Sequence, residues 1–189
     1  MIHIKENKGN KMKIYIVLTY TGTVLSKIVK LYTKKEFSHV SISLDKDLTQ
    51  MYSFGRLNAY NPFWAGFVQE YTDKGTFKRF KNTKTAIYEL DIDTEKYENI
   101  KQNIKKIEEE KDKYNFNIIG LFAVSINKRI KKDYSFYCAE FVKYVMEESD
   151  IEMDLPDIIK PEDFKNLENL ELIYTGLLKN YKLEANKTI

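Results

Sequence analysis

Cysteine, histidine and proline are scarce in this chain. Its 189 residues include one cysteine, two histidines and three prolines. A single cysteine excludes a disulfide within the chain, and together with two histidines it offers too few of the usual ligands for a zinc site. We therefore expect no metal, and the cysteine chemistry argued below requires no organic cofactor. The lack of an internal disulfide also fits a reducing compartment, so we expect a cytoplasmic protein.

Long apolar segments are lacking as well. The longest strongly apolar run, residues 118–126, is far shorter than the roughly 20 residues that a transmembrane helix needs. The N-terminal MIHIKENKGNKMK contains no apolar stretch of the kind found in secretory signal peptides. We expect neither a transmembrane segment nor secretion. Residues 1–11 are predicted to be a disordered leader, or to precede a start at Met12, and residues 12–189 to form a single domain.

The charge is small and evenly spread. The formal net charge is +3, and the basic residues are interleaved with acidic ones. This pattern argues against nucleic-acid binding. The 14 tyrosines and 11 phenylalanines could line an acyl-binding pocket, although such residues more often build a core.

Apolar periodicity divides the chain into strands and helices. Residues 55–75, with the only tryptophan and three glycines, are predicted to form a long irregular connection that covers part of the domain. Strands before and after a helical middle predict an α+β fold, with a mainly antiparallel sheet packed against helices. The predicted strands cover residues 13–20, 37–44, 49–54, 76–80, 85–92 and 170–176, and the predicted helices cover residues 23–32, 94–112 and 115–131, a segment starting near 137, and a short segment after Pro161.

Cys138 occupies the first turn of one predicted helix. Phe141, Val142 and Val145 follow it at i+3, i+4 and i+7, the spacing of one apolar helix face. Backbone N–H groups and the positive end of the helix dipole gather at a helix N-terminus and favour a thiolate over a thiol. This placement suits a nucleophile. A small apolar core residue would fit the same pattern.

His39 lies on a strand much earlier in the chain. The even-numbered residues from 40 to 44 are aliphatic, whereas His39 alternates with Ser41 and Ser43. The imidazole is therefore predicted to point away from the aliphatic face, beside small hydroxyl side chains. A half-buried surface histidine is equally compatible with this pattern. His3 lies in a polar, lysine-rich segment, and we expect no role for it.

Four segments resemble a known family. They read F-S-H-V-S-I-S, M-Y-S-F-G-R, N-P-F-W-A-G-F-V and Y-C-A-E-F-V. They are similar to segments of the permuted papain-like cysteine hydrolases, the YiiX-like group of the NlpC superfamily, which are relatives of lecithin retinol acyltransferase. In this branch the histidine strand precedes the cysteine helix, as it does here. The resemblance extends from about Lys13 to Tyr181 and implies a circularly permuted papain-like fold.

The resemblance also implies roles for individual residues. Cys138 matches the nucleophile and His39 the general base. The family usually places Glu or His on the next strand to orient the imidazole, but TQMYSF (49–54) contains neither. Aligning the strand ends puts Ser53 at this position, whereas a four-residue turn would put Gln50 and Tyr52 on the His39 face. We predict that one of the three bonds to the imidazole, with Ser53 as first choice.

Other candidates surround this pair. The backbone N–H of Cys138 is the expected first donor to an oxyanion, and Tyr20 or Tyr137 could supply a second. For both tyrosines the pattern favours a packing role over this one. Residues 55–75 are predicted to form a wall or lid, with Arg56 and Trp64 as substrate contacts and Phe67 as an apolar anchor.

The sequence thus predicts a thiol hydrolase. Its substrate would be a small molecule, peptide or acyl compound with an amide, ester or thioester bond. Cleavage of murein-type isopeptide bonds is a second possibility. A catalytically silent ligand-binding protein of the same fold is a third, favoured by the lack of Glu or His at the orienting position.

Overall fold

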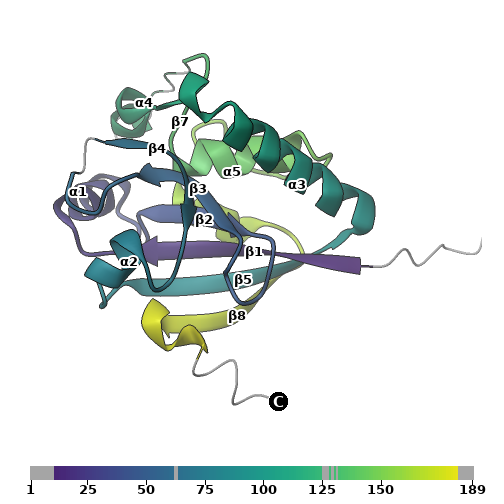
Figure 1. Cartoon of the computed structure of the whole chain (residues 1–189), viewed down its shortest axis with the longest axis horizontal. Helices are drawn as coiled ribbons and strands as arrows, with labels where there is room; N and C mark the ends of the chain where they lie inside the picture. The colour runs from purple at the N-terminus through teal and green to yellow at the C-terminus, as the bar shows by residue number, and fades with distance from the viewer. Residues whose placement is uncertain (1–10, 62–63, 125–127, 129, 131, 183–189) are drawn as a thin grey trace, which may run out of the picture.

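A six-stranded antiparallel sheet forms the centre of the molecule (Figure 1). The computed structural model describes residues 11–61, 64–124, 128, 130 and 132–182. The strands follow the spatial order β4-β3-β2-β1-β5-β8, and each neighbouring pair is antiparallel. Their bounds are β1 Lys11–Tyr20, β2 His39–Ser43, β3 Met51–Arg56, β4 Ala65–Glu70, β5 Lys84–Asp93 and β8 Leu170–Leu177.

Helices cover this sheet and connect its strands. A separate short parallel pair joins β6 (Asn115–Phe116) to β7 (Ser135–Phe136). The helices are α1 Val24–Thr33, α2 Gly75–Arg79, α3 Thr94–Glu109, α4 Ile118–Ala123 and α5 Cys138–Glu147, and single 3₁₀ segments cover Lys111–Lys113, Pro161–Asn166 and Leu178–Asn180. Among the described residues, no helix is both long and apolar enough to cross a membrane.

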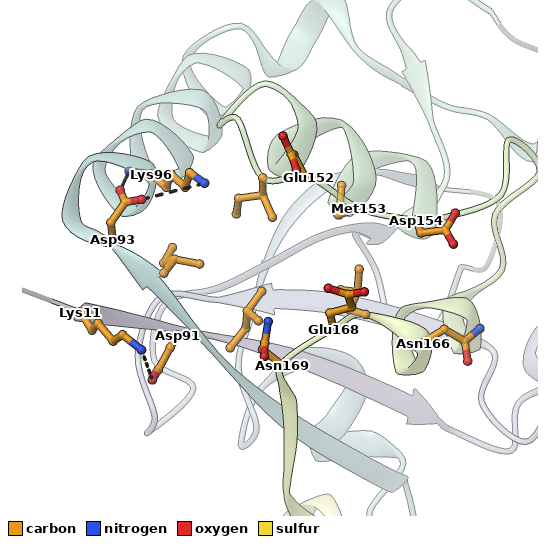
Figure 2. Close-up of a pocket in the computed structure, with 14 residues that line it drawn as sticks. Lys11, Asp91, Asp93, Lys96, Glu152, Met153, Asp154, Asn166, Glu168 and Asn169 are labelled. Carbon is orange, nitrogen blue, oxygen red and sulfur yellow. Dashed lines mark hydrogen bonds and ion pairs between the residues drawn. The ribbon is translucent and has the colours of Figure 1, made fainter. Parts of the chain in front are cut away.

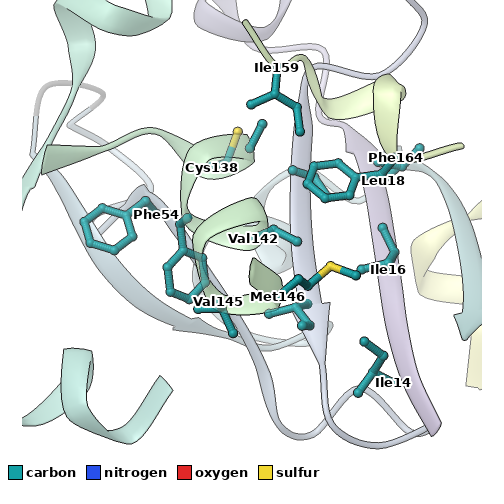
Figure 3. Close-up of a cluster of buried hydrophobic side chains, with 14 of the residues drawn as sticks. Ile14, Ile16, Leu18, Phe54, Cys138, Val142, Val145, Met146, Ile159 and Phe164 are labelled. Atoms are coloured by element: carbon teal, nitrogen blue, oxygen red, sulfur yellow. The ribbon is translucent and has the colours of Figure 1, made fainter. Parts of the chain in front are cut away.

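The main core lies between the sheet and two helices, α3 and α5. Alternate residues of β1 and β2, such as Ile16 and Ile42, face this side, and α5 presents Val142, Val145 and Met146 to them (Figure 3). The opposite face of the sheet carries a smaller apolar cluster that includes Phe77 of α2. The central strand β1 is therefore buried on both faces, which explains its continuous apolar run. These contacts confirm the predicted α+β class with a mainly antiparallel sheet.

Three predicted elements differ from the structure. Residues 76–80 lie in helix α2 and the residue after it rather than in a strand, and Phe77 is the one buried side chain of that helix. The segment 55–75 contains a regular strand, β4, which pairs with β3 over its whole length. Its glycines and proline disguised the strand, because these residues are depleted in strands.

The helix predicted over 115–131 is also shorter. Asn117 caps α4, its side-chain Oδ1 accepting a hydrogen bond from Gly120 N at 2.8 Å, so the helix begins at Ile118. Positions 115 and 116 instead pair with β7. Residues 125–127, 129 and 131 lie outside the described residues, as do residues 1–10 of the predicted leader. Lys11 is not part of a leader, because β1 begins there.

Candidate functional site

His39 and Cys138 each begin an element, and these elements meet at one pocket. His39 is the first residue of β2 and Cys138 the first of α5, and α5 packs against β2 and β3. The imidazole and the thiol line the same pocket, and the thiol is among the groups that raise the pKa of His39. Cys138 is only 4% exposed, so a reagent must reach the sulfur through this pocket. The structure thus brings together the two residues that the sequence singled out.

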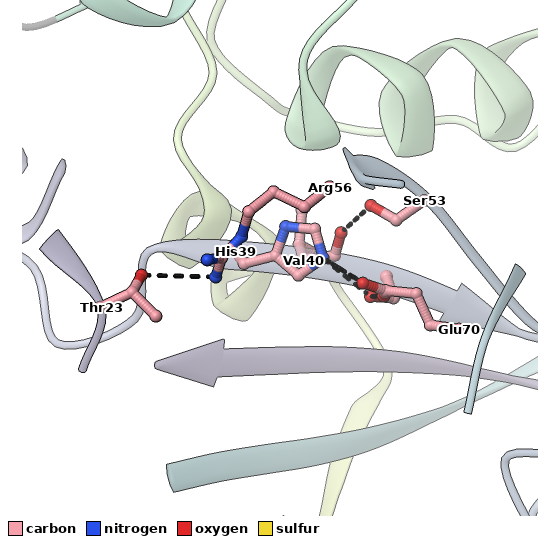
Figure 4. A network of polar contacts seen from close by, with 7 residues as sticks. Thr23, His39, Val40, Ser53, Arg56 and Glu70 are labelled. Carbon is pink, nitrogen blue, oxygen red and sulfur yellow. Dashed lines mark hydrogen bonds and ion pairs between the residues drawn. The ribbon is translucent and has the colours of Figure 1, made fainter. Parts of the chain in front are cut away.

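Glu70, the last residue of β4, holds the imidazole from its other side. Its Oε1 and Oε2 atoms lie 3.1 and 3.2 Å from Nε2 of His39 (Figure 4). The hydroxyl of Ser41 donates a second hydrogen bond to the same carboxylate. Because Glu70 engages Nε2, a thiol that approached the ring would meet Nδ1. The carboxylate therefore holds the imidazole in the pocket that His39 shares with Cys138.

The prediction that Ser53, Gln50 or Tyr52 orients the imidazole is wrong. The register pairs Ile42 with Tyr52, which puts Ser53 on the His39 face, but the Ser53 hydroxyl donates to the Val40 carbonyl at 2.7 Å. Tyr52 faces the other side of the sheet and stacks on an aromatic ring there. Gln50 lies exposed in the turn, where its N–H donates to a side chain of the same turn.

Gly55 leaves the space in which the imidazole and the carboxylate meet. A Cβ atom built at this position would lie 3.3 Å from Cε1 of His39 and 3.6 Å from Oε1 of Glu70. The first distance is closer than ordinary van der Waals contact, so a side chain here would push directly on the ring. Gly55 is a positioning residue that sequence reasoning missed. The available signal was its place within strand β3, where a glycine often marks the close approach of another group.

We expect Gly55→Ala to slow alkylation of Cys138 about tenfold, because displacing the imidazole by a fraction of an ångström would remove much of the benefit of its orientation. The measurement is the rate at which iodoacetamide alkylates the single cysteine at neutral pH. Gly66→Ala is the matched control. Gly66 pairs directly with Gly55, but its added Cβ would meet Leu57 at an ordinary 3.5 Å. Equal rates for the two variants would show that the space at Gly55 is unimportant.

The ion pair of His39 and Glu70 shifts the protonation of both groups. Burial alone would lower the pKa of His39, but the Glu70 carboxylate and hydrogen bonds to Cys138 and Glu70 outweigh it and raise that pKa well above 6.5. Burial alone would raise the pKa of Glu70, but His39, Ser41 and Arg56 outweigh it and lower that pKa. An imidazolium and a carboxylate therefore coexist at neutral pH.

The N-terminus of α5 provides a place for negative charge on a reacting oxygen. Phe141 N–H donates to the carbonyl of Tyr137, so the N–H of Cys138 precedes the first bond within the helix. Glu140 accepts from the backbone N–H of Tyr137 at 3.2 Å and so fixes this first turn. The Tyr137 hydroxyl donates to the carbonyl of Ile159 at 2.9 Å, which commits its proton to packing. Tyr137 is therefore not an oxyanion donor.

Tyr20 does not line the pocket either. Its ring lies under the ammonium group of Lys30, 4.7 Å from the ring centroid. Of the described residues that line the pocket, none is a tyrosine. A second oxyanion donor is thus not provided by either predicted tyrosine.

The segment 55–75 contributes one wall of the pocket. Arg56, Ala65 and Glu70 line it, as the predicted wall requires. Trp64 does not line it and is 59% exposed, so its predicted substrate contact is wrong for this structure. Phe67 is a buried anchor, but it packs in the main core against Phe141.

A larger hollow lies elsewhere on the molecule. It has a volume of about 1130 Å³, and its walls come from β1, β5 and the segments 151–154 and 166–169 (Figure 2). Its described lining contains neither histidine nor cysteine. Lys11 and Asp91, 3.7 Å apart, form an ion pair there. Size alone therefore does not identify the reactive site.

Two comparisons of the chain with known proteins and protein families found no match. No protein-family model matches the chain, and no curated protein matches it. Among the described residues, no cluster of three or more His, Cys, Asp or Glu side chains is placed to hold a metal ion. The chemistry of the site therefore has to be inferred from its own geometry.

Proposed function

We propose that this protein is a cysteine-dependent hydrolase with a circularly permuted papain-like fold. The observation that carries the proposal is that Cys138 and His39 line one pocket, where Glu70 holds the imidazole. The substrate class is an amide, ester or thioester of acyl or peptide type. The order of the chain, with the histidine strand before the cysteine helix, supports the permuted arrangement. A cytoplasmic location belongs to the same proposal.

The geometry supports a two-step acyl transfer. The Cys138 thiolate attacks the carbonyl carbon, and the oxyanion that forms lies toward the N–H groups at the start of α5. Collapse of this intermediate breaks the bond to the leaving group, which takes a proton from the His39 imidazolium. Neutral His39 then removes a proton from water as the water attacks the thioester. The acid product leaves, and the thiolate and imidazolium are restored.

Glu70 weakens the alternative of a silent binding protein. That alternative depended on the lack of a residue to orient the imidazole, and Glu70 occupies this position with two short contacts. Murein-type isopeptide cleavage uses the same chemistry, so it stays within the proposed reaction class. Only a substrate comparison separates it from acyl-amide or thioester hydrolysis.

A substrate screen tests the proposal. Acyl-amide, ester, thioester and peptide substrates are incubated with the protein, with Cys138→Ala as the blank. We expect at least one class to be hydrolysed only when Cys138 is present, with an acyl adduct on the protein seen by mass spectrometry. A silent binding protein would show no Cys138-dependent turnover, and iodoacetamide would alkylate it no faster than it alkylates glutathione.

A further inference from the structure

Arg56 places a cation in the wall of the reactive pocket. It is the one Lys or Arg among the described residues that line this pocket. Arg56 is half-buried, and a buried cation without an anion at contact distance is costly. The neighbouring carboxylate, Glu70, is already engaged by His39 and Ser41. Arg56 is therefore available to a further anion.

The contacts of Arg56 hold it without an ion pair, and the Glu70 carboxylate acts on it only from a longer distance. Its Nη2 donates to the Thr23 hydroxyl at 3.3 Å, and its guanidinium carbon lies 5.4 Å from the centroid of the Phe80 ring. No carboxylate lies within ion-pair distance of Arg56 in the part of the chain that the structure describes. These contacts leave guanidinium donors for a planar bidentate partner.

The rest of the pocket indicates the size and polarity of the anionic group that could bind at Arg56. Its volume is about 70 Å³, enough for a small group beside the sulfur. Hydroxyl side chains flank Arg56, and Thr21 and Thr23 lie 3.2 Å apart through their Oγ atoms. Apolar side chains, including Leu25 and Leu121, complete the lining. A single guanidinium best matches one negative charge.

We infer that Arg56 recognises a carboxylate of the substrate close to the bond that Cys138 attacks. This inference rests on the proposed function and narrows its substrate class to acyl or peptidyl compounds that carry a carboxylate near the scissile carbonyl. The planar guanidinium and the planar carboxylate form two parallel hydrogen bonds. Binding through Arg56 then orients the carbonyl toward the sulfur.

Paired alkylating agents test this role without a known substrate. N-iodoacetylglycine and N-iodoacetyl-β-alanine carry a carboxylate, and N-iodoacetylglycinamide is the uncharged counterpart. In each reaction an S–C bond forms at Cys138, the C–I bond breaks and iodide leaves. The quantity of interest is the ratio of the charged-probe rate to the uncharged-probe rate, divided by the same ratio for glutathione. Because the chain has one cysteine, every adduct reports on Cys138.

We expect this normalised rate ratio to be about ten or more for one of the two charged probes in the native protein. Arg56→Gln should bring it close to one, and Arg56→Lys should retain part of it. Arg79→Gln is the matched control, because Arg79 also lies near Phe80 but is directed to the Ala59 carbonyl. That variant should keep the native ratio, also at high salt, where long-range attraction is screened.

Two results would overturn the inference. One is a native ratio near one for both charged probes, and the other is an equal loss of the ratio in Arg56→Gln and Arg79→Gln. Failure of the proposed hydrolase is seen separately, in the uncharged probe. In that case the uncharged probe reacts with Cys138 no faster than with glutathione while the ratio still depends on Arg56. Cys138 is then a thiol of ordinary reactivity, and the carboxylate site at Arg56 stands.

Discussion

Glu70→Gln is expected to lower the rate of Cys138 chemistry by about 10²–10⁴-fold, in the range that follows loss of the orienting carboxylate in other nucleophile–histidine sites. The amide keeps the size of the side chain and a hydrogen-bonding group near Nε2. It removes the negative charge that stabilises the imidazolium. The measurement is turnover of a substrate found in the screen; iodoacetamide alkylation depends only on the thiolate, so it should slow by no more than about thirtyfold. His39→Ala should fall at least as far, because it also removes the proton carrier.

The same substitution should change how His39 titrates. In the native protein its pKa is raised above 6.5, chiefly because the Glu70 charge outweighs the effect of burial. Glu70→Gln should lower that pKa, since burial then acts with less opposition. Proton NMR of the imidazole reports this directly, and His3→Ala assigns the signals because the chain has only two histidines. A His39 titration unchanged by Glu70→Gln would contradict the ion pair.

The pH dependence of stability follows from the two shifts. The raised pKa of His39 contributes stability fully below about 6.5, and this contribution is lost as pH rises through the folded-state value. The lowered pKa of Glu70 contributes above about 4.5 and is lost as pH falls through its folded-state value. The pair therefore stabilises the fold most between these two ordinary values. Glu70→Gln should flatten the pH profile of unfolding in this region.

Local patterns in the sequence were enough to find two members of the site. Cys138 begins a strongly periodic helix, and His39 breaks the alternation of an aliphatic strand, so each is visible within about ten residues. Glu70 was not visible in this way. It reaches His39 from β4, which is separated from β2 by β3, and that strand was mistaken for an irregular connection. His39 and Glu70 can meet because Gly55, which lies beside both, has no side chain.

The remaining error was the choice of the residue that orients His39, because strand register alone does not identify it. Ser53 lies on the face that the strand-end alignment indicated, but the space beyond His39 belongs to a longer side chain from another strand. The two-residue period of each strand settles which face a residue occupies, but it does not settle which side chain of another strand lies beside it. Pocket residues from loops and helix ends, such as Thr23 and Leu121, depend on the tertiary fold in the same way.

Phe54→Ala is expected to destabilise the protein by about 3–5 kcal/mol, the usual cost of removing a buried aromatic ring. Phe54 is fully buried in β3 and joins the sheet to α5, since its ring centroid lies 5.3 Å from that of Phe141. It also contacts Phe136 at 5.3 Å between centroids, just before the Cys138 helix begins. Loss of the ring therefore removes packing against α5 itself and against the strand residue just before it.

Urea unfolding monitored by circular dichroism measures this loss. Trp64→Ala is the matched control, because that ring is 59% exposed and its removal should change the free energy of unfolding by no more than about 0.5 kcal/mol. Phe54→Leu, which fills part of the space, should cost less than Phe54→Ala. Because Phe54 also lines the pocket, the folded fraction of Phe54→Ala should alkylate more slowly at Cys138. A change of less than 1 kcal/mol in Phe54→Ala would mean that α5 is held to the sheet by other contacts, and the position of Cys138 would then not depend on this aromatic layer.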